Sequence, residues 1–193
     1  DNLFYSRRIG QRASVYPEIN DGEEVIEYPS AIDLVNAVKI SGRTKEGLGI
    51  GFLNTVTKKT DVVIRDIKTG AERVEIVEPL ANYNVLVLDQ RFNGNSSVSL
   101  INTNVTRNGD FRDANVTATA FNLNTKKNTY NANGVLRYSY VNDYKNLDNK
   151  KGISTNLGFA ETSGKIRFSV NGEYVSEDYD NNDLGVNFQT NYF

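Results

Sequence analysis

The segment from Arg107 to Asp113 holds the residue types best suited to acid–base chemistry in this chain. Asp110 and Asp113 supply two carboxylates, and Arg107 and Arg112 lie close enough in the sequence to hold them ionised. Glycoside hydrolases use such a pair of carboxyl groups, about 5–9.5 Å apart. The alternative, which we favour, is an ion-pair knot that anchors a loop.

Composition removes most other kinds of catalysis. The 193 residues include no Cys and no His, so neither a Ser-His-Asp relay nor a thiol nucleophile can be assembled. Carboxylate chemistry is what remains, and the sequence favours a protein that is not an enzyme. The 22 Lys and Arg residues nearly balance the 24 Asp and Glu residues, which gives no electrostatic case for nucleic acid as a partner.

A second acidic segment, residues 176–183, offers oxygen ligands of the kind that Ca²⁺ binds. Its candidate metal ligands are Asp178, Asp180 and Asp183. The segment lacks the ordered EF-hand pattern of Asp or Asn at alternate positions, then Gly, then a distal Glu. A solvated loop is therefore the interpretation we favour, and we expect no cofactor.

The elements that must position these residues are strands. Alternation of apolar and polar residues with a period of two recurs almost throughout the chain, and sustained helical periodicity is hard to find. The sequence predicts a single all-β domain over residues 1–193, an antiparallel up-and-down meander of about ten strands. Their predicted bounds are Leu3–Gly10, Ala31–Gly42, Leu48–Thr57, Leu80–Phe92, Ser97–Thr106, Ala114–Leu123, Thr129–Val141, Gly152–Thr162, Lys165–Ser176 and Leu184–Phe193.

The connectors of this meander are predicted to alternate in length. Short turns are expected at residues 43–47, 93–96, 124–128 and 163–164, and longer connectors lie between them. The longest, residues 58–79, carries a hairpin signal of its own. Transmembrane β-barrels have tight turns on the periplasmic side and longer loops outside. We therefore expect the meander to be part of a transmembrane β-barrel whose short turns face the periplasm.

The two faces of the predicted strands differ in polarity, as the wall of a barrel requires. In the strand predicted at 129–141, Leu136, Tyr138 and Tyr140 share one face, and polar residues share the other. Tyr and Phe also gather near strand ends, where an aromatic girdle would lie. A one-sided soluble sheet would alternate in the same way. The residues predicted to face a lumen are Lys39, Arg137, Arg167 and Glu173. They would either select what enters it or pair with one another and stiffen the wall.

Several segments resemble the barrel region of a Bacteroidetes family of outer-membrane proteins, the domain of unknown function 5916. They occur in a consistent order over most of the chain and are Leu3–Gly10, Ala37–Thr44, Leu48–Asn54, Glu78–Tyr83, Gly109–Ala114 and Asn182–Gly185. The resemblance implies a location in the bacterial outer membrane. Because this domain commonly follows a carbohydrate-binding-module family 9-like domain, it also implies a link to glycans.

Members of that family look like longer chains with a signal peptide and a larger barrel, so the resemblance implies that these residues are a fragment. The last predicted strand supports the same interpretation. Its apolar positions include Val186, Phe188 and Tyr192, and Phe193 is out of phase with them. The terminal aromatic residue of a complete barrel would face lipid, so we interpret Phe193 as a cut point.

Three functions remain as hypotheses. The first is an outer-membrane β-barrel fragment with a structural, channel or scaffold role linked to glycan binding or uptake. Its expected partners are the lipid bilayer, the rest of a longer parent chain, and glycans. The second is a soluble all-β carbohydrate-binding module. The third is a glycan hydrolase that depends on Asp110 and Asp113.

Overall fold

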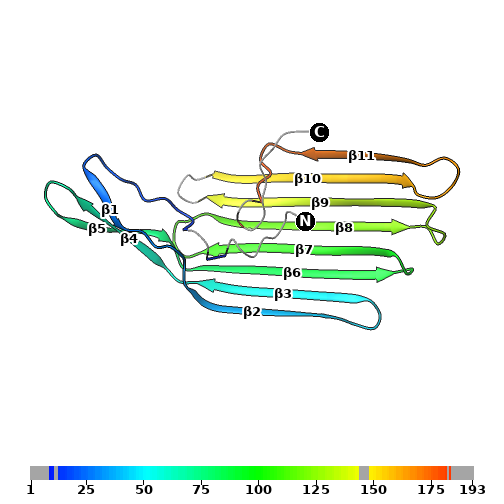
Figure 1. Cartoon of the computed structure of the whole chain (residues 1–193), viewed down its shortest axis with the longest axis horizontal. Coiled ribbons are helices and arrows are strands. Elements are labelled where there is room, and N and C mark those ends of the chain that lie inside the picture. The colour runs from blue at the N-terminus through cyan, green and yellow to red at the C-terminus, as the bar shows by residue number, and fades with distance from the viewer. Residues whose placement is uncertain (1–8, 11–12, 144–147, 182, 184–193) are drawn as a thin grey trace.

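The computed structural model describes residues 9–10, 13–143, 148–181 and 183, and the regular elements of this part of the chain are β-strands (Figure 1). Paired strands are antiparallel. No helix in the described residues is long and apolar enough to cross a bilayer. The eleven strands found there are β1 (Glu23–Glu27), β2 (Leu34–Arg43), β3 (Leu48–Thr57), β4 (Thr60–Asp66), β5 (Glu72–Glu78), β6 (Ala81–Phe92), β7 (Ser96–Arg107), β8 (Asp113–Asn124), β9 (Tyr130–Asp143), β10 (Asp148–Glu161) and β11 (Phe168–Val175).

Eight of the strands form one large sheet in the order β11-β10-β9-β8-β7-β6-β3-β2. Neighbours in this sheet are consecutive in the chain except at β3 and β6, where the chain leaves to form β4 and β5 (Figure 1). The prediction of an all-β antiparallel meander is confirmed for the described residues. The largest difference between a predicted and an observed strand end is at β10, which begins at Asp148 and was predicted to begin at Gly152.

The large sheet is open within the described residues, with β2 and β11 as its edges. No closed barrel is therefore seen in this part of the chain. The first and last predicted strands, Leu3–Gly10 and Leu184–Phe193, lie outside the described residues apart from Ile9 and Gly10.

A separate sheet of three strands, in the order β1-β4-β5, lies at one end of the large sheet (Figure 1). The hairpin predicted within residues 58–79 is confirmed as β4 and β5. Val62, Ile64 and Val77 form its buried core. The sequence assigned β1 to a connector, which is wrong. Three of its five residues are Glu, and that obscured the strand pattern.

Three of the four predicted short turns are confirmed, but the turn predicted at 163–164 is a longer connector, residues 162–167 between β10 and β11. The prediction that every other connector is long is wrong. The chain reverses tightly after β2, β6 and β8, and Asn93 and Gly94 both have positive φ. On the opposite rim residues 58–80 make a long excursion and residues 13–33, which contain β1, precede β2, but β9 and β10 remain paired as far as Asp143 and Asp148. Residues 144–147 alone separate these two strands.

The two faces of the large sheet have different surroundings. We call inner the face on which Tyr83, Val85 and Val105 are buried, with Ile9 packed against them. Directly paired residues point to the same face and adjacent residues to opposite faces. The register therefore assigns Val116 and Ser139, both buried, to the inner face as well.

Candidate functional site

A cluster of ion pairs lies on the inner face, at the end of the large sheet nearest the small sheet. Arg107 ends β7, and Arg112 directly precedes β8. Arg107 donates from Nη2 to Asp183 Oδ1 at 2.9 Å, and Arg112 donates to Asp183 Oδ2 from Nε at 3.0 Å and from Nη2 at 2.7 Å. Arg112 Nη2 also lies 3.1 Å from Asp180 Oδ2. One carboxylate therefore joins two guanidinium groups.

Burial makes this cluster more than a surface ion pair. The side chains of Arg107 and Asp183 are 6% and 10% exposed. Burial acts to raise the pKa of Asp183, but the charges of Arg107 and Arg112 outweigh it and hold that pKa below its usual range. Asp183 is therefore ionised at neutral pH. The arginine fork suits such a carboxylate because it can donate several hydrogen bonds at once.

The carboxylates reach the arginines because the segment after β11 turns back across the sheet. We call this segment, residues 176–181 and 183, the strap. The Ser176 amide donates to the Ile153 carbonyl of β10 at 2.9 Å, and the Asp180 amide donates to Ser139 Oγ of β9 at 3.0 Å. The strap therefore passes over β10 and β9 before it reaches the β7–β8 connector.

A glycine permits this close passage. A Cβ atom added at Gly152 would lie 2.2 Å from the backbone of Tyr179, so no larger residue fits beneath the strap. The Tyr179 side chain is itself buried. The strap and the side chain of Ile9 thus both cover the inner face at this end of the sheet.

Asp110 and Asp113, the two carboxylates predicted to lie beside Arg107 and Arg112, do not bind the guanidinium groups of these arginines. Arg112 binds the strap instead of Asp110, which is exposed on the connector. Asp113 accepts the backbone amide of Arg107 at 2.7 Å, as a loop-closing residue would. The guanidinium of Arg107 likewise binds Asp183. The geometry is that of an ion-pair knot, but its central carboxylate, Asp183, lies 76 residues after Arg107 and 71 residues after Arg112.

The predicted calcium ligands are divided between two environments. Asp178 is exposed, whereas Asp180 and Asp183 bind arginine. Within the described residues no group of three or more acidic side chains gathers as a metal site would require. Calcium binding at the strap stays a prediction without support from this geometry.

Three of the four predicted lumen residues lie on the inner face. Lys39 belongs to the inner row that contains Val85, Arg137 pairs with Ala118, and Glu173 pairs with Asn156. Arg167 precedes the first residue of β11 and lies outside the paired register. The role of these residues in selecting a solute stays a prediction.

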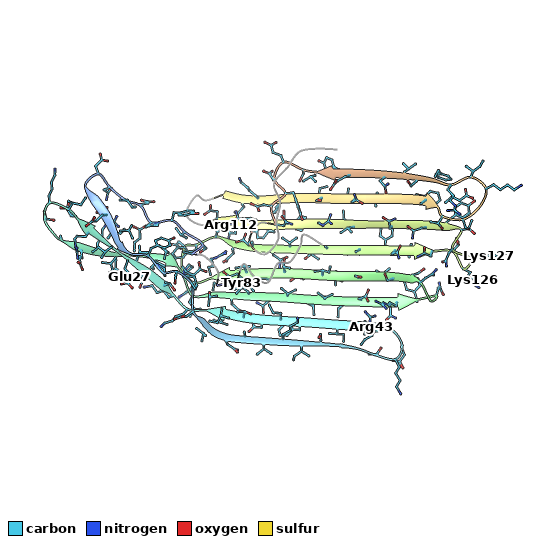
Figure 2. All side chains as sticks on the ribbon, in the orientation of Figure 1. Glu27, Arg43, Tyr83, Arg112, Lys126 and Lys127 are labelled. Atoms are coloured by element: carbon cyan, nitrogen blue, oxygen red, sulfur yellow. The ribbon has the colours of Figure 1, made fainter. Side chains whose placement is uncertain are left out.

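The sequence did not reveal a buried glutamate between the two sheets. Glu78 ends β5 and is 1% exposed. Its Oε2 accepts the backbone amide of Ser14 at 2.7 Å, and its Oε1 accepts the Tyr83 hydroxyl at 3.2 Å. Figure 2 shows Tyr83 and Arg112 at the same end of the large sheet, with Arg43, Lys126 and Lys127 at the other. The available signal was that Glu78 and Tyr83 are the two ends of one of the segments that carry the family resemblance.

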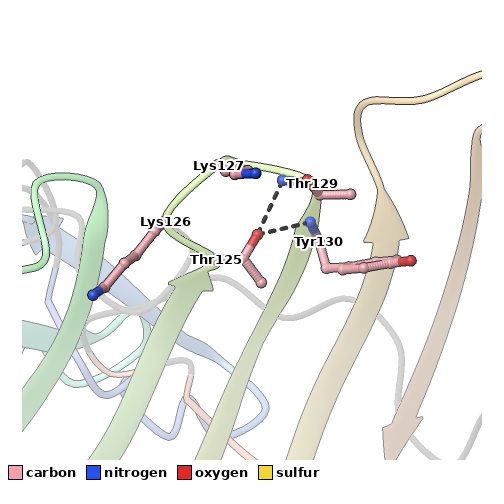
Figure 3. Close-up of a pocket in the computed structure, with 5 residues that line it drawn as sticks. All are labelled: Thr125, Lys126, Lys127, Thr129 and Tyr130. Carbon is pink, nitrogen blue, oxygen red and sulfur yellow. Dashed lines mark hydrogen bonds between the residues drawn. The ribbon is translucent and has the colours of Figure 1, made fainter.

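A small hollow of about 310 Å³ opens at the short-turn rim between β8 and β9. It is lined by Thr125, Lys126, Lys127, Thr129 and Tyr130 (Figure 3). Thr125 Oγ1 accepts the amides of Thr129 and Tyr130 at 3.0 and 3.1 Å, which closes the turn. The Lys126 side chain extends away from Lys127 (Figure 3), so the two ammonium groups do not form a joint anion site.

Comparison with known proteins gives one match. A family model described as a domain of unknown function, DUF5916, covers residues 1–193. No curated protein and no solved structure matches the chain.

Proposed function

The chain belongs to the DUF5916 family, and from the two faces of its large sheet we propose that it forms part of the wall of a β-barrel in a bacterial outer membrane. Its role in this proposal is that of a channel or scaffold, with the bilayer and the rest of a longer chain as partners. The single observation that carries the proposal is the exposed apolar outer face.

Large apolar side chains on the outer face are exposed on each of the eight strands. No described segment packs over them. A soluble monomer rarely exposes a contiguous apolar surface of more than a few hundred Å², whereas the outer wall of a barrel is apolar because it meets lipid. These residues are Val38, Ile40, Ile50, Phe52, Leu86, Val98, Leu100, Leu123, Leu136, Ile153, Leu157, Phe159, Phe168 and Val170.

Between β6 and β8 the edge of this apolar surface crosses the strands obliquely, whereas on β9 and β10 it returns, because Leu136 pairs with Thr119 and Ile153 pairs with Tyr138. In β6 the outer face changes from apolar to polar after Leu86, at Asn84. In β7 the change comes two residues nearer the short turns, because Leu86 pairs with Asn102. In β8 it comes two residues nearer again, because Leu100 pairs with Thr119.

That displacement can be converted to an angle. From β3 to β8 the boundary moves about four residues of about 3.4 Å across three strand spacings of about 4.8 Å, which is an angle of about 40°. The strands of outer-membrane barrels tilt by about 35–45°. From β3 to β8 the edge therefore has the slope of a level lipid boundary on tilted strands, whereas on β9 and β10 the apolar surface extends beyond that line.

The short turns are staggered in the same direction (Figure 1). In the β2–β3 hairpin the last pair before the turn is Arg43–Gly49. The register places Asn156 of β10 in the same row, and β10 continues for five more residues, to Glu161, before its last pair with β11. Turns that lie at one depth in a membrane would be staggered in this way. The inner face supports the proposal too, since Arg137, Asn156 and Glu173 suit a wet lumen.

Membrane insertion tests the proposal directly. The purified chain is mixed with phospholipid vesicles and floated on a density gradient, with detergent dependence measured in parallel. We expect co-flotation and a requirement for detergent in the absence of vesicles. A monodisperse chain in plain buffer that does not float would contradict the proposal and favour a soluble binding module.

Substitution of the two faces sharpens this test. Leu100→Arg places a charge on the outer face, at a cost of about 2–4 kcal/mol if the residue lies near the bilayer midplane, and we expect it to reduce insertion. Asn156→Arg is the matched control, because Asn156 lies on the inner face. Equal losses in both variants would refute a lipid-facing outer surface.

A further inference from the structure

Four asparagines stand in one row on the outer face, on four neighbouring strands. Asn54 of β3 pairs with Asn84 of β6, Asn84 pairs with Asn104 of β7, and Asn104 pairs with Asn115 of β8. Asn82, Asn102 and Thr117 flank this row on the same face. We call these seven residues the amide array. Each is half-buried, and none is charged.

Hydrogen bonds within the amide array hold some of its side chains in place. Asn54 Nδ2 donates to Oδ1 of Asn82 at 2.6 Å and of Asn84 at 2.8 Å. Asn102 Nδ2 donates to Asn115 Oδ1 at 3.2 Å and to Thr117 Oγ1 at 2.8 Å. The array therefore consists of two bonded groups, with Asn104 between them.

Much of the bonding capacity of the array is unused. Among the described residues, the side chain of Asn104 makes no hydrogen bond, and the amide nitrogens of Asn82, Asn84 and Asn115 have no acceptor. A side-chain amide offers two N–H donors and a carbonyl acceptor. The array thus presents a flat, neutral surface of donors and acceptors, spaced at the strand repeat of about 4.8 Å.

We propose that the amide array binds the hydroxyl groups of a saccharide, supplied by the sugar portion of a glycolipid in the adjacent membrane leaflet. The location supports this occupant, because the array begins where the apolar outer face ends on β3, β6 and β7. Hydroxyl groups both donate and accept, which matches amides. A phosphate would need cations, and the array contains none. The choice of a glycolipid rests on the proposed function, whereas binding of hydroxyl groups does not.

Two alanine variants test the array. Asn104→Ala removes the central amide without breaking a hydrogen bond seen in the described residues. Asn156→Ala is the matched control, because its amide also makes none there but lies on the inner face. The full chain in detergent is titrated with lipopolysaccharide and, separately, with the free oligosaccharide released from it. Binding is followed by the side-chain amide signals of ¹⁵N-labelled asparagine.

The side-chain amide signals of Asn104 are identified by their absence from the Asn104→Ala spectrum. We expect these signals to shift when the wild-type chain is titrated. The dissociation constant should rise about fivefold in Asn104→Ala, as expected for the loss of one or two hydrogen bonds, and stay unchanged in Asn156→Ala. The same fivefold loss with the free oligosaccharide would support the array and make a free glycan its ligand. Equal effects of both variants, or shifts confined to inner-face amides, would overturn the proposal.

Failure of the membrane proposal is recognised separately. A chain that does not float with phospholipid vesicles but binds the free oligosaccharide through Asn104 retains the amide array and loses only the glycolipid. A chain that floats but shows no difference between the two variants retains the barrel wall and loses the array.

Discussion

Replacement of Asp183 by alanine should destabilise the fold by about 3 kcal/mol. The change leaves the guanidinium of Arg107, which is 6% exposed, without its carboxylate. Breaking a buried ion pair by removing one partner costs about 3–5 kcal/mol. Arg112 is 33% exposed and keeps Asp180 as a neighbour, so water can replace part of what it loses. The lower end of the range therefore applies.

Urea unfolding in one detergent, followed by far-UV circular dichroism, measures this cost. With a slope of about 2 kcal/mol per M, a loss of 3 kcal/mol lowers the midpoint by about 1.5 M. Asp110→Ala is the matched control, because Asp110 lies exposed on the same connector as Arg112. We expect it to change stability by less than about 0.5 kcal/mol. Equal midpoints for Asp183→Ala and wild type would refute the role assigned to the cluster.

Acid titration gives an independent check of the same cluster. The pKa of Asp183 is lower in the folded chain than in the unfolded one, because of Arg107 and Arg112. Its stabilising contribution is therefore complete above an ordinary Asp pKa of about 4 and is lost as the pH falls through the folded value. Wild type should lose more stability than Asp183→Ala in this window. Parallel curves for the two proteins would contradict that account.

Two further predictions concern the strap and the small sheet. Gly152→Ala should destabilise by about 1–3 kcal/mol, because its Cβ would meet the backbone of Tyr179 at 2.2 Å; Gly172→Ala, with open space around it, is the control in the same urea assay, and comparable losses would count against a tight strap. In β1, hydrogen bonds from Arg73 and the Asn20 amide lower the pKa of Glu23 to about 2, so its carboxylate should stay ionised at pH 3. An NMR titration should show that pKa rising in Arg73→Gln, and an unchanged value would refute the assignment.

Local pattern was enough to predict the meander but not the acidic partners in the cluster. The alternation in β3 gave its bounds, Leu48–Thr57, without error. Arg107 and Arg112 were identified as half of an ion-pair knot, but Asp183 lies 76 residues after Arg107. A charge that distant in sequence leaves no mark on the local pattern.

The amino-acid sequence by itself determined the all-β class, the order of the strands in the meander and the two unlike faces, because each follows from residues that are neighbours along the chain. The tertiary structure decided where each strand ends relative to its neighbours in the sheet. It also decided that the Asn residues of β3, β6, β7 and β8 form one array and that the strap returns to Arg107. These depend on the register between strands and on a chain reversal over Gly152. Both are set by packing between distant segments, which periodicity within one segment does not contain.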